Sequence, residues 1–312
     1  MGVGEIIQIS NSLQLVCTVF AALLGLAFGS FLNVVISRLP EGESIVTPRS
    51  HCRNCDHTLA WWENLPVLSW LLLLGRCRQC QIRISLRYPF IELTIAILWA
   101  AIWLNTQSGG TMHIGLSDQP VVRPILLIGF GLLSWLLIAL AALDAEYLWL
   151  PDWITLPGIV LGFIFSMMLQ WFRELPGGID YDRSLLVRSS VPELAVTYAI
   201  AILACAGLIL IIRLAYWLVR RQEGMGLGDA KLMAMLGAWL GLQGALESFA
   251  LAIFGALIAA LVWLAILSLR RKSSEWAKMP LPLGTFLCLG ALTEIFYPNW
   301  LWTTWTHAIL NN

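Results

Sequence analysis

Two aspartates each lie beside a long apolar run of the sequence, where an ionised carboxylate costs free energy. Asp144 follows the run 125–143, and Asp229 precedes a run that begins at Lys231. Ionisable groups in such places are usually functional. Two carboxyl groups held a few ångströms apart cannot both ionise easily, so they share a proton. The ionised group can then take a proton from water while the protonated group polarises a peptide carbonyl.

Glycines precede the second aspartate in the sequence GMGLGD, residues 224–229. Gly226 and Gly228 have no Cβ atom, so this backbone can adopt strained angles and approach a substrate strand closely. The spacing matches neither the dinucleotide fingerprint G-x-G-x-x-G nor a P-loop. We therefore expect the glycines to support Asp229 rather than to bind phosphate.

Other interpretations of these acidic residues stay open. An acidic side chain at a helix start often caps exposed N–H groups. Taken by itself, Asp229 could be such a cap and have no other role. Asp152, which directly precedes an apolar run, is a stronger candidate for such a cap. Glu146 is a rival acid two residues after Asp144, and we favour Asp144 because it lies closer to the apolar run.

Four cysteines form two C-x-x-C pairs, CRNC at 52–55 and CRQC at 77–80, separated by 21 residues. This pattern is typical of a four-thiolate zinc site, with Cys52, Cys55, Cys77 and Cys80 as ligands. A closed shell of four ligands leaves no open position, so the zinc should be structural. Disulfides or redox chemistry are the alternative, and they suit a reducing compartment less well.

The composition places the chain in a membrane. Hydrophobic residues make up 59%, charged residues 12%, and the mean hydropathy is +0.78, whereas soluble domains carry about 25% charged residues. The net charge of zero gives no reason to expect a nucleic-acid partner. We predict an all-α polytopic protein with about eight transmembrane helices in the lipid bilayer. The predicted spans are 13–36, 88–105, 125–143, 153–172, 193–219, 231–244, 246–269 and 281–298.

Lysine and arginine predict the orientation of these spans. Fourteen of the 19 basic residues lie in or at the ends of three connections, 37–87, 220–231 and 270–280. Basic connections stay in the cytoplasm, which places these three loops and 144–152 inside and both termini outside. Asp144 and Asp229 then lie at the same, cytoplasmic, face of the membrane.

Five blocks in this order resemble the bacterial type IV prepilin peptidases, which are leader peptidases and N-methyltransferases with a GxGD aspartic site. The blocks are GSFLNVVISRLP (29–40), the cysteine loop with WWENLPVLSW (61–70), RYPFIEL (87–93), LDAEYLWLPDWITLP (143–157) and GMGLGDAKL (224–232). The resemblance covers nearly the whole chain. One departure is CRNC, where many members have proline after the first cysteine.

The resemblance implies a catalytic pair, Asp144 and Asp229, and zinc bound by the four cysteines. It also implies S-adenosylmethionine as methyl donor, and cleavage of prepilins or pseudopilins after a glycine at the cytoplasmic face of the bacterial inner membrane. The partners would be pilus or type II secretion machinery. We expect a first span (1–36), a cytoplasmic zinc domain (37–87) and a transmembrane peptidase domain (88–312).

The methyl-donor site is not assigned by any block. Glu63, Asn64, Arg87 and Glu92 are polar residues of the matched blocks, and they either serve that site or anchor the loop to the helices. Three other functions remain alternatives. One is a GxGD protease with other membrane substrates, the second a transporter that relays ions through the carboxylates, and the third a non-catalytic assembly factor.

Overall fold

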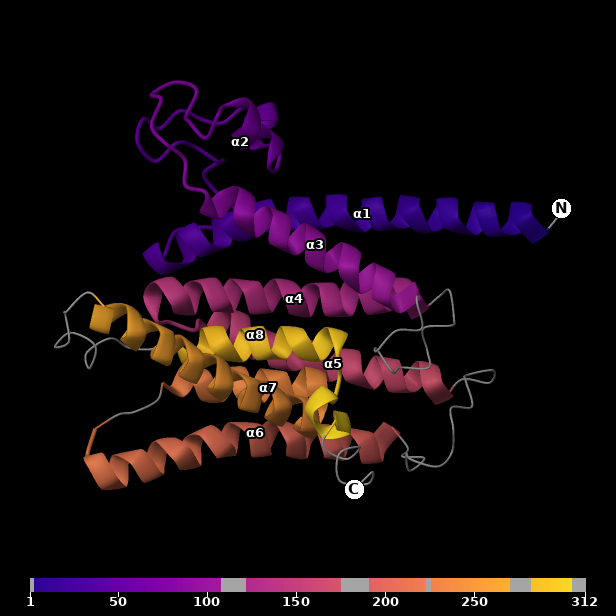
Figure 1. Cartoon of the computed structure of the whole chain (residues 1–312), viewed down its shortest axis with the longest axis vertical. Coiled ribbons are helices and arrows are strands. Elements are labelled where there is room, and N and C mark those ends of the chain that lie inside the picture. The colour runs from indigo at the N-terminus through magenta and orange to yellow at the C-terminus, as the bar shows by residue number, and fades with distance from the viewer. Residues whose placement is uncertain (1–2, 108–121, 175–190, 223–225, 270–281, 305–312) are drawn as a thin grey trace. The chain divides into compact units, whose positions relative to one another are not determined.

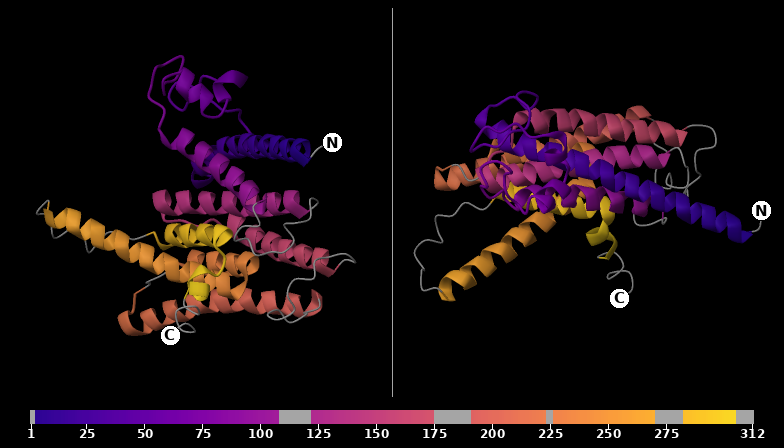
Figure 2. Two further views of the ribbon diagram at one scale, coloured as in Figure 1. Left: turned by 45° about the vertical axis from the view of Figure 1, so that its right-hand side comes forward. Right: turned by 90° about the horizontal axis from the view of Figure 1, so that it is seen from above.

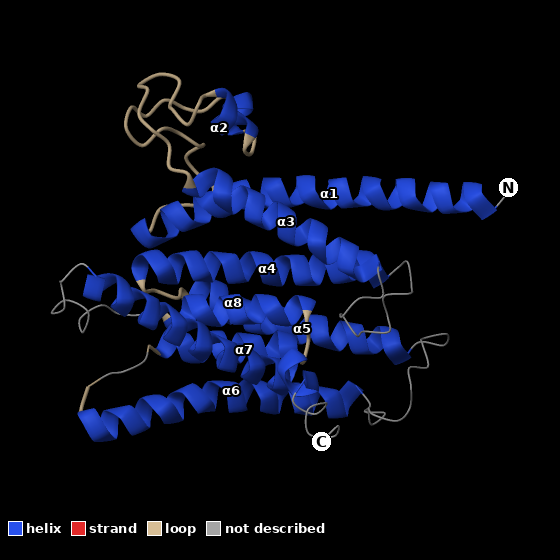
Figure 3. Ribbon diagram, viewed as in Figure 1, coloured by secondary structure: helices blue, strands red, loops and turns tan. Residues whose placement is uncertain are grey.

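The computed structural model describes residues 3–107, 122–174, 191–222, 226–269 and 282–304. These residues form α-helices and short 3-10 helices, with no β-strand among them and two isolated β-bridges (Figure 3). They fall into two compact units. The first contains the described residues up to 107 together with 122–139, and the second contains those from 140 onwards.

The first unit is built on a close crossing of α1 (Val3–Arg38) and α3 (Arg87–Gln107). Gly25 and Gly29 lie one turn apart on α1, and each faces the backbone of α3 (Figure 1). A Cβ atom added at Gly29 would lie 2.7 Å from Cα of Glu92, and one added at Gly25 would lie equally close to Cα of Ala96. In lipid, helices associate by such close packing of small residues.

The first part of α4 (Val122–Tyr147) completes this unit. The indole N–H of Trp135 donates to the carbonyl oxygen of Phe28 on α1, at 3.0 Å. Trp99 on α3 donates to the carbonyl oxygen of Gly131 on α4, at 3.1 Å. These two bonds give the indole N–H groups of Trp99 and Trp135 an acceptor, as their apolar surroundings require.

The segment between α1 and α3 is a small domain of irregular backbone. It holds two 3-10 turns, η1 (Leu39–Glu41) and η2 (Trp61–Asn64), and one short helix, α2 (Leu68–Leu72). In Figure 1 it lies beyond the end of α1 and the start of α3. The segment between the two helices is residues 39–86, and the predicted domain boundaries, 37–87, stay a prediction.

The second unit contains α5 (Asp152–Glu174), α6 (Val191–Arg220), α7 (Leu227–Leu269) and α8 (Leu283–Phe296), with the end of α4. Trp239 on α7 packs against Gly162 on α5, and its indole N–H donates to the carbonyl oxygen of Gly158 at 2.8 Å. A Cβ atom at Gly237 would lie 2.9 Å from the carbonyl oxygen of Ala201 on α6. The first half of α7 is therefore the centre of this unit.

Gly241 divides α7 into two helices. Its φ of 71° and ψ of −178° are not helical, and only glycine adopts such angles at little cost. Gly244 faces Glu294 near the end of α8, whereas Gly255 faces Phe286 near its start. The second half of α7 therefore runs antiparallel to α8, and the chain doubles back at Gly241 (Figure 2).

All eight predicted apolar runs lie on helices of the described chain. Among the residues that the structure describes, six helices are long and apolar enough to cross a membrane, so this is a multi-pass membrane protein. The predicted spans 231–244 and 246–269 are the two halves of α7, divided near Gly241. The predicted span 281–298 contains α8, which has 14 residues and is shorter than an ordinary span.

The crossing of α1 and α3 can be tested by adding one methyl group. Gly29→Ala should lower the free energy of unfolding by about 1–3 kcal/mol, because its Cβ atom would overlap the backbone of α3. Gly207→Ala on α6 is the control, since nothing lies within 4 Å of its Cβ position. Thermal unfolding of the purified protein in detergent measures both. Equal melting temperatures for the two variants would contradict this packing.

Candidate active site and metal centre

Asp144 lies in the last turn of α4 and is buried, with 6% of its surface exposed. Its Oδ2 accepts a hydrogen bond from the backbone N–H of Thr285, at 2.7 Å, and lies 3.2 Å from the Thr285 hydroxyl. Thr285 is in the first turn of α8, whose N–H groups carry partial positive charge. The N-terminus of α8 is therefore the main binding partner of this carboxylate.

Asp229 lies in the first turn of α7, half-buried, and its Oδ2 accepts the backbone N–H of Gly226 at 3.2 Å. An acid that reaches back to the residue before its helix satisfies one of the exposed N–H groups. Asp229 therefore makes a capping contact from within the helix, two residues after α7 begins at Leu227, and not from the N-cap position. This contact does not exclude a second role, because a carboxylate can accept several hydrogen bonds.

The structure brings Asp144 and Asp229 together at one end of the second unit. Asp144 Oδ2 lies 2.9 Å from the position that a Cβ atom would take at Gly284 on α8, and Gly228 directly precedes Asp229 on α7. Leu150 holds the ends of the helices in place, because it packs against both Gly228 on α7 and Gly284 on α8. A Cβ atom at Gly228 would lie 2.9 Å from Cβ of Leu150, so packing already requires glycine there.

The other acids near the pair have different surroundings. Glu146 is exposed, in contrast to Asp144. Asp152 is the first residue of α5, and its carboxylate forms an ion pair with Lys231 at 2.5 Å, while its capping role stays a prediction. This pair ties the start of α5 to the start of α7, two residues beyond Asp229.

Thr285 was not recognised in the sequence. Its hydroxyl lies 3.1 Å from the carbonyl oxygen of Ala141 and 3.2 Å from Asp144 Oδ2, so it links the end of α4 to the start of α8. A signal was available in the sequence PLGT (282–285), because a proline just before an apolar run is typical of a helix start. Nothing in the sequence pairs that start with Asp144.

A second pair of buried acids, Glu247 and Glu294, lies near the turn at Gly241. Glu294 accepts the backbone N–H of Asn299, and Glu247 accepts that of Leu301, each at 3.0 Å. These carboxyl groups satisfy backbone donors of the segment after α8. We therefore assign them to the fold.

The four predicted cysteine ligands form one cluster in the first unit. All four Sγ atoms lie within 4.8 Å of one another. The closest pairs join the two motifs, with 3.8 Å between Cys52 and Cys80 and 3.9 Å between Cys55 and Cys77. Tetrahedral thiolates about 2.3 Å from a metal lie about 3.8 Å apart. The cluster could therefore hold a metal ion without rearrangement.

The two motifs have the same backbone structure. In the first motif, the backbone N–H of Cys52 donates to the carbonyl oxygen of His57, and that of Leu59 donates to the carbonyl oxygen of Ser50. In the second motif, the backbone N–H of Cys77 donates to the carbonyl oxygen of Ile82, and that of Ile84 donates to the carbonyl oxygen of Gly75. The residue that follows each motif, Asp56 or Gln81, has a left-handed backbone conformation. A hydrogen bond from the Ile82 backbone lowers the pKa of the Cys80 thiol, whereas the pKa of Cys55 is raised in the same cluster, so the thiols share their protons.

Two buried glutamates anchor this domain. Glu63 Oε2 accepts the backbone N–H of Ala60 at 2.8 Å and lies 3.1 Å from Nε2 of His57. These contacts lower the pKa of Glu63, with the Ala60 bond as the largest cause. Glu92 on α3 accepts the backbone N–H of Val67 at 2.7 Å. Glu92 thus joins α3 to the domain, whereas the contacts of Glu63 lie within the domain, and a role of either residue in the methyl-donor site stays a prediction.

Curated relatives match this chain over most of its length. The prepilin leader peptidase/N-methyltransferase of Aeromonas hydrophila is 32% identical, with 88% of this chain and 89% of the relative covered. That of Pseudomonas putida is also 32% identical, with 89% of each covered. That of Myxococcus xanthus is 37% identical, with 71% of this chain and 56% of the relative covered. No solved structure matches the chain.

Two family models match in the order that the sequence blocks predict. The bacterial peptidase A24 N-terminal domain matches residues 23–106, which include the crossing of α1 and α3 and the cysteine cluster. The type IV leader peptidase family matches residues 131–265, which include Asp144 and Asp229. Together with the relatives, these matches show that the chain belongs to the type IV leader peptidase family.

Proposed function

We propose that this protein is an aspartic endopeptidase of the membrane that removes the leader from prepilins or pseudopilins and methylates the new amino terminus. The observation that carries the peptidase proposal is the meeting of Asp144 and Asp229 at one end of the second unit. The names of the relatives, prepilin leader peptidase/N-methyltransferase, support both activities.

The proposed mechanism assigns different roles to the two carboxyl groups. Asp144, in contact with the N-terminus of α8, is the better placed to hold the negative charge and to take a proton from water. Asp229, protonated, donates to the scissile carbonyl oxygen. Water oxygen bonds to the carbonyl carbon, the C–N bond breaks, and the proton passes to the departing amine.

The site would lie at the cytoplasmic face of the bacterial inner membrane. The excess of basic residues in the connections 37–87, 220–231 and 270–280, the second of which contains Asp229, supports this orientation. A substrate helix in the bilayer would present its basic leader and the bond after glycine at the same depth. Pilus or type II secretion machinery would then receive the product. The proposed peptidase domain is 88–312.

Removal of either acid should abolish cleavage. Asp144→Asn and Asp229→Asn keep the side-chain shape but lose the acid, so each should slow leader release at least about 100-fold. The assay follows the mass of a model prepilin incubated with the purified protein in detergent. Glu146→Gln is the matched control and should cleave normally, because its side chain is exposed.

Wild-type cleavage by both aspartate variants would refute the aspartic mechanism. The pair would then be structural or ion-conducting, and ion flux in liposomes would distinguish those two roles. A requirement for glycine before the cut separates a leader peptidase from a protease with other membrane substrates.

The hydroxyl of Thr285 should contribute to the same reaction. Thr285→Val removes one hydrogen bond to the Asp144 carboxylate and should lower kcat roughly tenfold. Thr293→Val is the control, since that hydroxyl bonds only to the carbonyl oxygen of Gly290 within α8. The two kcat values are compared under saturating prepilin. Similar values would show that the Thr285 hydroxyl has no role.

The cysteine cluster is proposed to hold structural zinc. Its four thiolates, at spacings that fit a tetrahedral shell, are the ligands that zinc prefers. Zinc there would join the two C-x-x-C motifs, 52–55 and 77–80, and would order the domain between α1 and α3. A closed shell offers no position for a substrate or a catalytic water.

Metal analysis tests this assignment. We expect about one zinc ion per wild-type chain, as the tetrahedral four-thiolate site implies, and almost none in Cys77→Ser. Cys17→Ser should keep its zinc, because Cys17 lies on α1 outside the cluster. Limited proteolysis should show faster cutting within 43–86 in the zinc-free variant. Full zinc content in Cys77→Ser would refute the site.

A further inference from the structure

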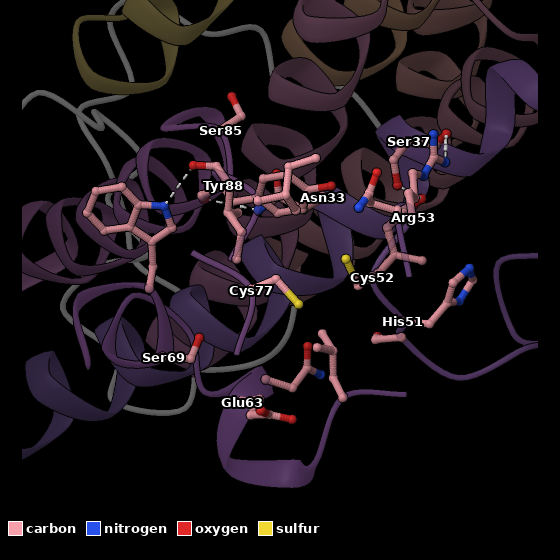
Figure 4. A pocket seen from close by; sticks show the side chains of 18 of the residues that line it. Asn33, Ser37, His51, Cys52, Arg53, Glu63, Ser69, Cys77, Ser85 and Tyr88 are labelled. Atoms are coloured by element: carbon pink, nitrogen blue, oxygen red, sulfur yellow. Dashed lines mark hydrogen bonds between the residues drawn. The ribbon is translucent and has the colours of Figure 1, made fainter. Parts of the chain in front are cut away.

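A large cavity lies in the first unit, between the cysteine domain and the adjoining ends of α1 and α3. Its volume is about 720 Å³, which is within the range for small-molecule sites. Its lining comes from α1 (Asn33, Arg38), from the domain (Glu63, Trp70) and from α3 (Tyr88) among others. In the view of Figure 4, Asn33 and Glu63 lie on opposite sides of Cys52 and Cys77. The peptidase mechanism makes no use of this cavity.

Two buried atoms of the lining have no hydrogen-bond partner. Asn33 is 2% exposed, and although its amide nitrogen donates to the carbonyl oxygen of Tyr88, its Oδ1 accepts nothing. The side chain of Glu63 is fully buried, and its Oε1 also lacks a hydrogen bond, with Arg78 at 4.0 Å. Buried polar atoms are rarely left unsatisfied. Both atoms are acceptors, so the missing partner should be a donor.

Charges around the cavity also favour a cationic ligand. Arg53 is held by Glu41 at 2.7 Å, and Arg38 donates to the carbonyl oxygen of Ser44 at 2.9 Å. These guanidinium groups therefore already have protein partners. Glu63, whose pKa is lowered by its contacts, stays ionised at neutral pH. Arg78 and Arg83 also line the cavity, and Arg78 approaches Glu63 Oε1 only to 4.0 Å, so this oxygen of the carboxylate still lacks a hydrogen-bond donor.

The rest of the lining suits a flat aromatic group. Trp70 and Tyr88 contribute aromatic rings, and Leu59, Leu73 and Ile82 contribute aliphatic side chains. Trp70 is held firmly, because its indole N–H donates to the carbonyl oxygen of Ile84 at 3.2 Å and its ring packs on Gly75. A purine base could stack on such a ring. Hydroxyl and ammonium donors of the same ligand could reach the free acceptors.

We propose that this cavity binds S-adenosylmethionine, with Asn33 and Glu63 accepting hydrogen bonds from its ribose hydroxyls and its ammonium group. The inference rests on the methyltransferase part of the proposed function, for which the ligand supplies a methyl group on a sulfonium. Glu63 would also face the net positive charge of the ligand. Zinc in its closed shell would keep the two sides of the cavity in place without contacting the methyl donor.

Equilibrium binding of radiolabelled S-adenosylmethionine to the zinc-loaded, full-length protein in detergent tests the proposal. Glu63→Gln and Asn33→Ala should each raise the Kd about tenfold or more, because each removes a buried acceptor or its charge. Glu146→Gln removes the same charge from an exposed side chain of the second unit that does not line the cavity, so its Kd should stay within about twofold of wild type. Zinc content and leader cleavage show that each variant is folded.

Each result has a distinct meaning. Unchanged Kd values in folded Glu63→Gln and Asn33→Ala would overturn the assignment of the cavity, while wild-type methylation would leave the proposed function intact. No binding and no methylation by the wild type would overturn the methyltransferase proposal itself. Displacement of the radioligand by a lysine-rich leader peptide would assign the cavity to the leader instead.

Discussion

The contact between Asp144 and the first turn of α8 is the interaction on which the second unit depends. The carboxylate and the start of α8 each supply the hydrogen-bond partners that the other lacks. A buried carboxylate requires donors, and α8 follows Pro282, which offers no side-chain cap for the first N–H groups of the helix. One contact satisfies both and fixes the end of α4 against α8. Leu150 then seats the glycine-containing start of α7 beside it. The same contacts thus hold the helices and position the two acids.

Local chemistry is what made much of this predictable from sequence. The apolar runs had to become helices, since lipid offers no partner to an open backbone. The two C-x-x-C motifs could be recognised because each tight turn is encoded within a few residues, and the structure gives them matching hydrogen bonds. The positions of Asp144 and Asp229 followed from counting spans and basic loops. Their meeting in one unit agrees with that count.

Other features depend on contacts between distant segments, and the sequence alone did not reveal them. Gly25 and Gly29 look like ordinary glycines of an apolar helix until α3 lies against them. Gly241 is one of several glycines in α7, yet only it has non-helical angles within that helix. Thr285 lies 141 residues from Asp144, and the cavity beside Asn33 draws on segments as far apart as α1 and α3. Such pairings require knowledge of how the helices pack.

The reversal at Gly241 has a consequence for the surrounding lipid. Residues 227–240 and α8 are each about 21 Å long at 1.5 Å per residue, whereas the hydrocarbon layer is about 30 Å thick. Helices too short for a bilayer thin it locally. A substrate helix of ordinary length that entered this thinned patch would protrude from it. Hydrophobic mismatch would thereby expose the peptide bond at its end to water and to the two aspartates.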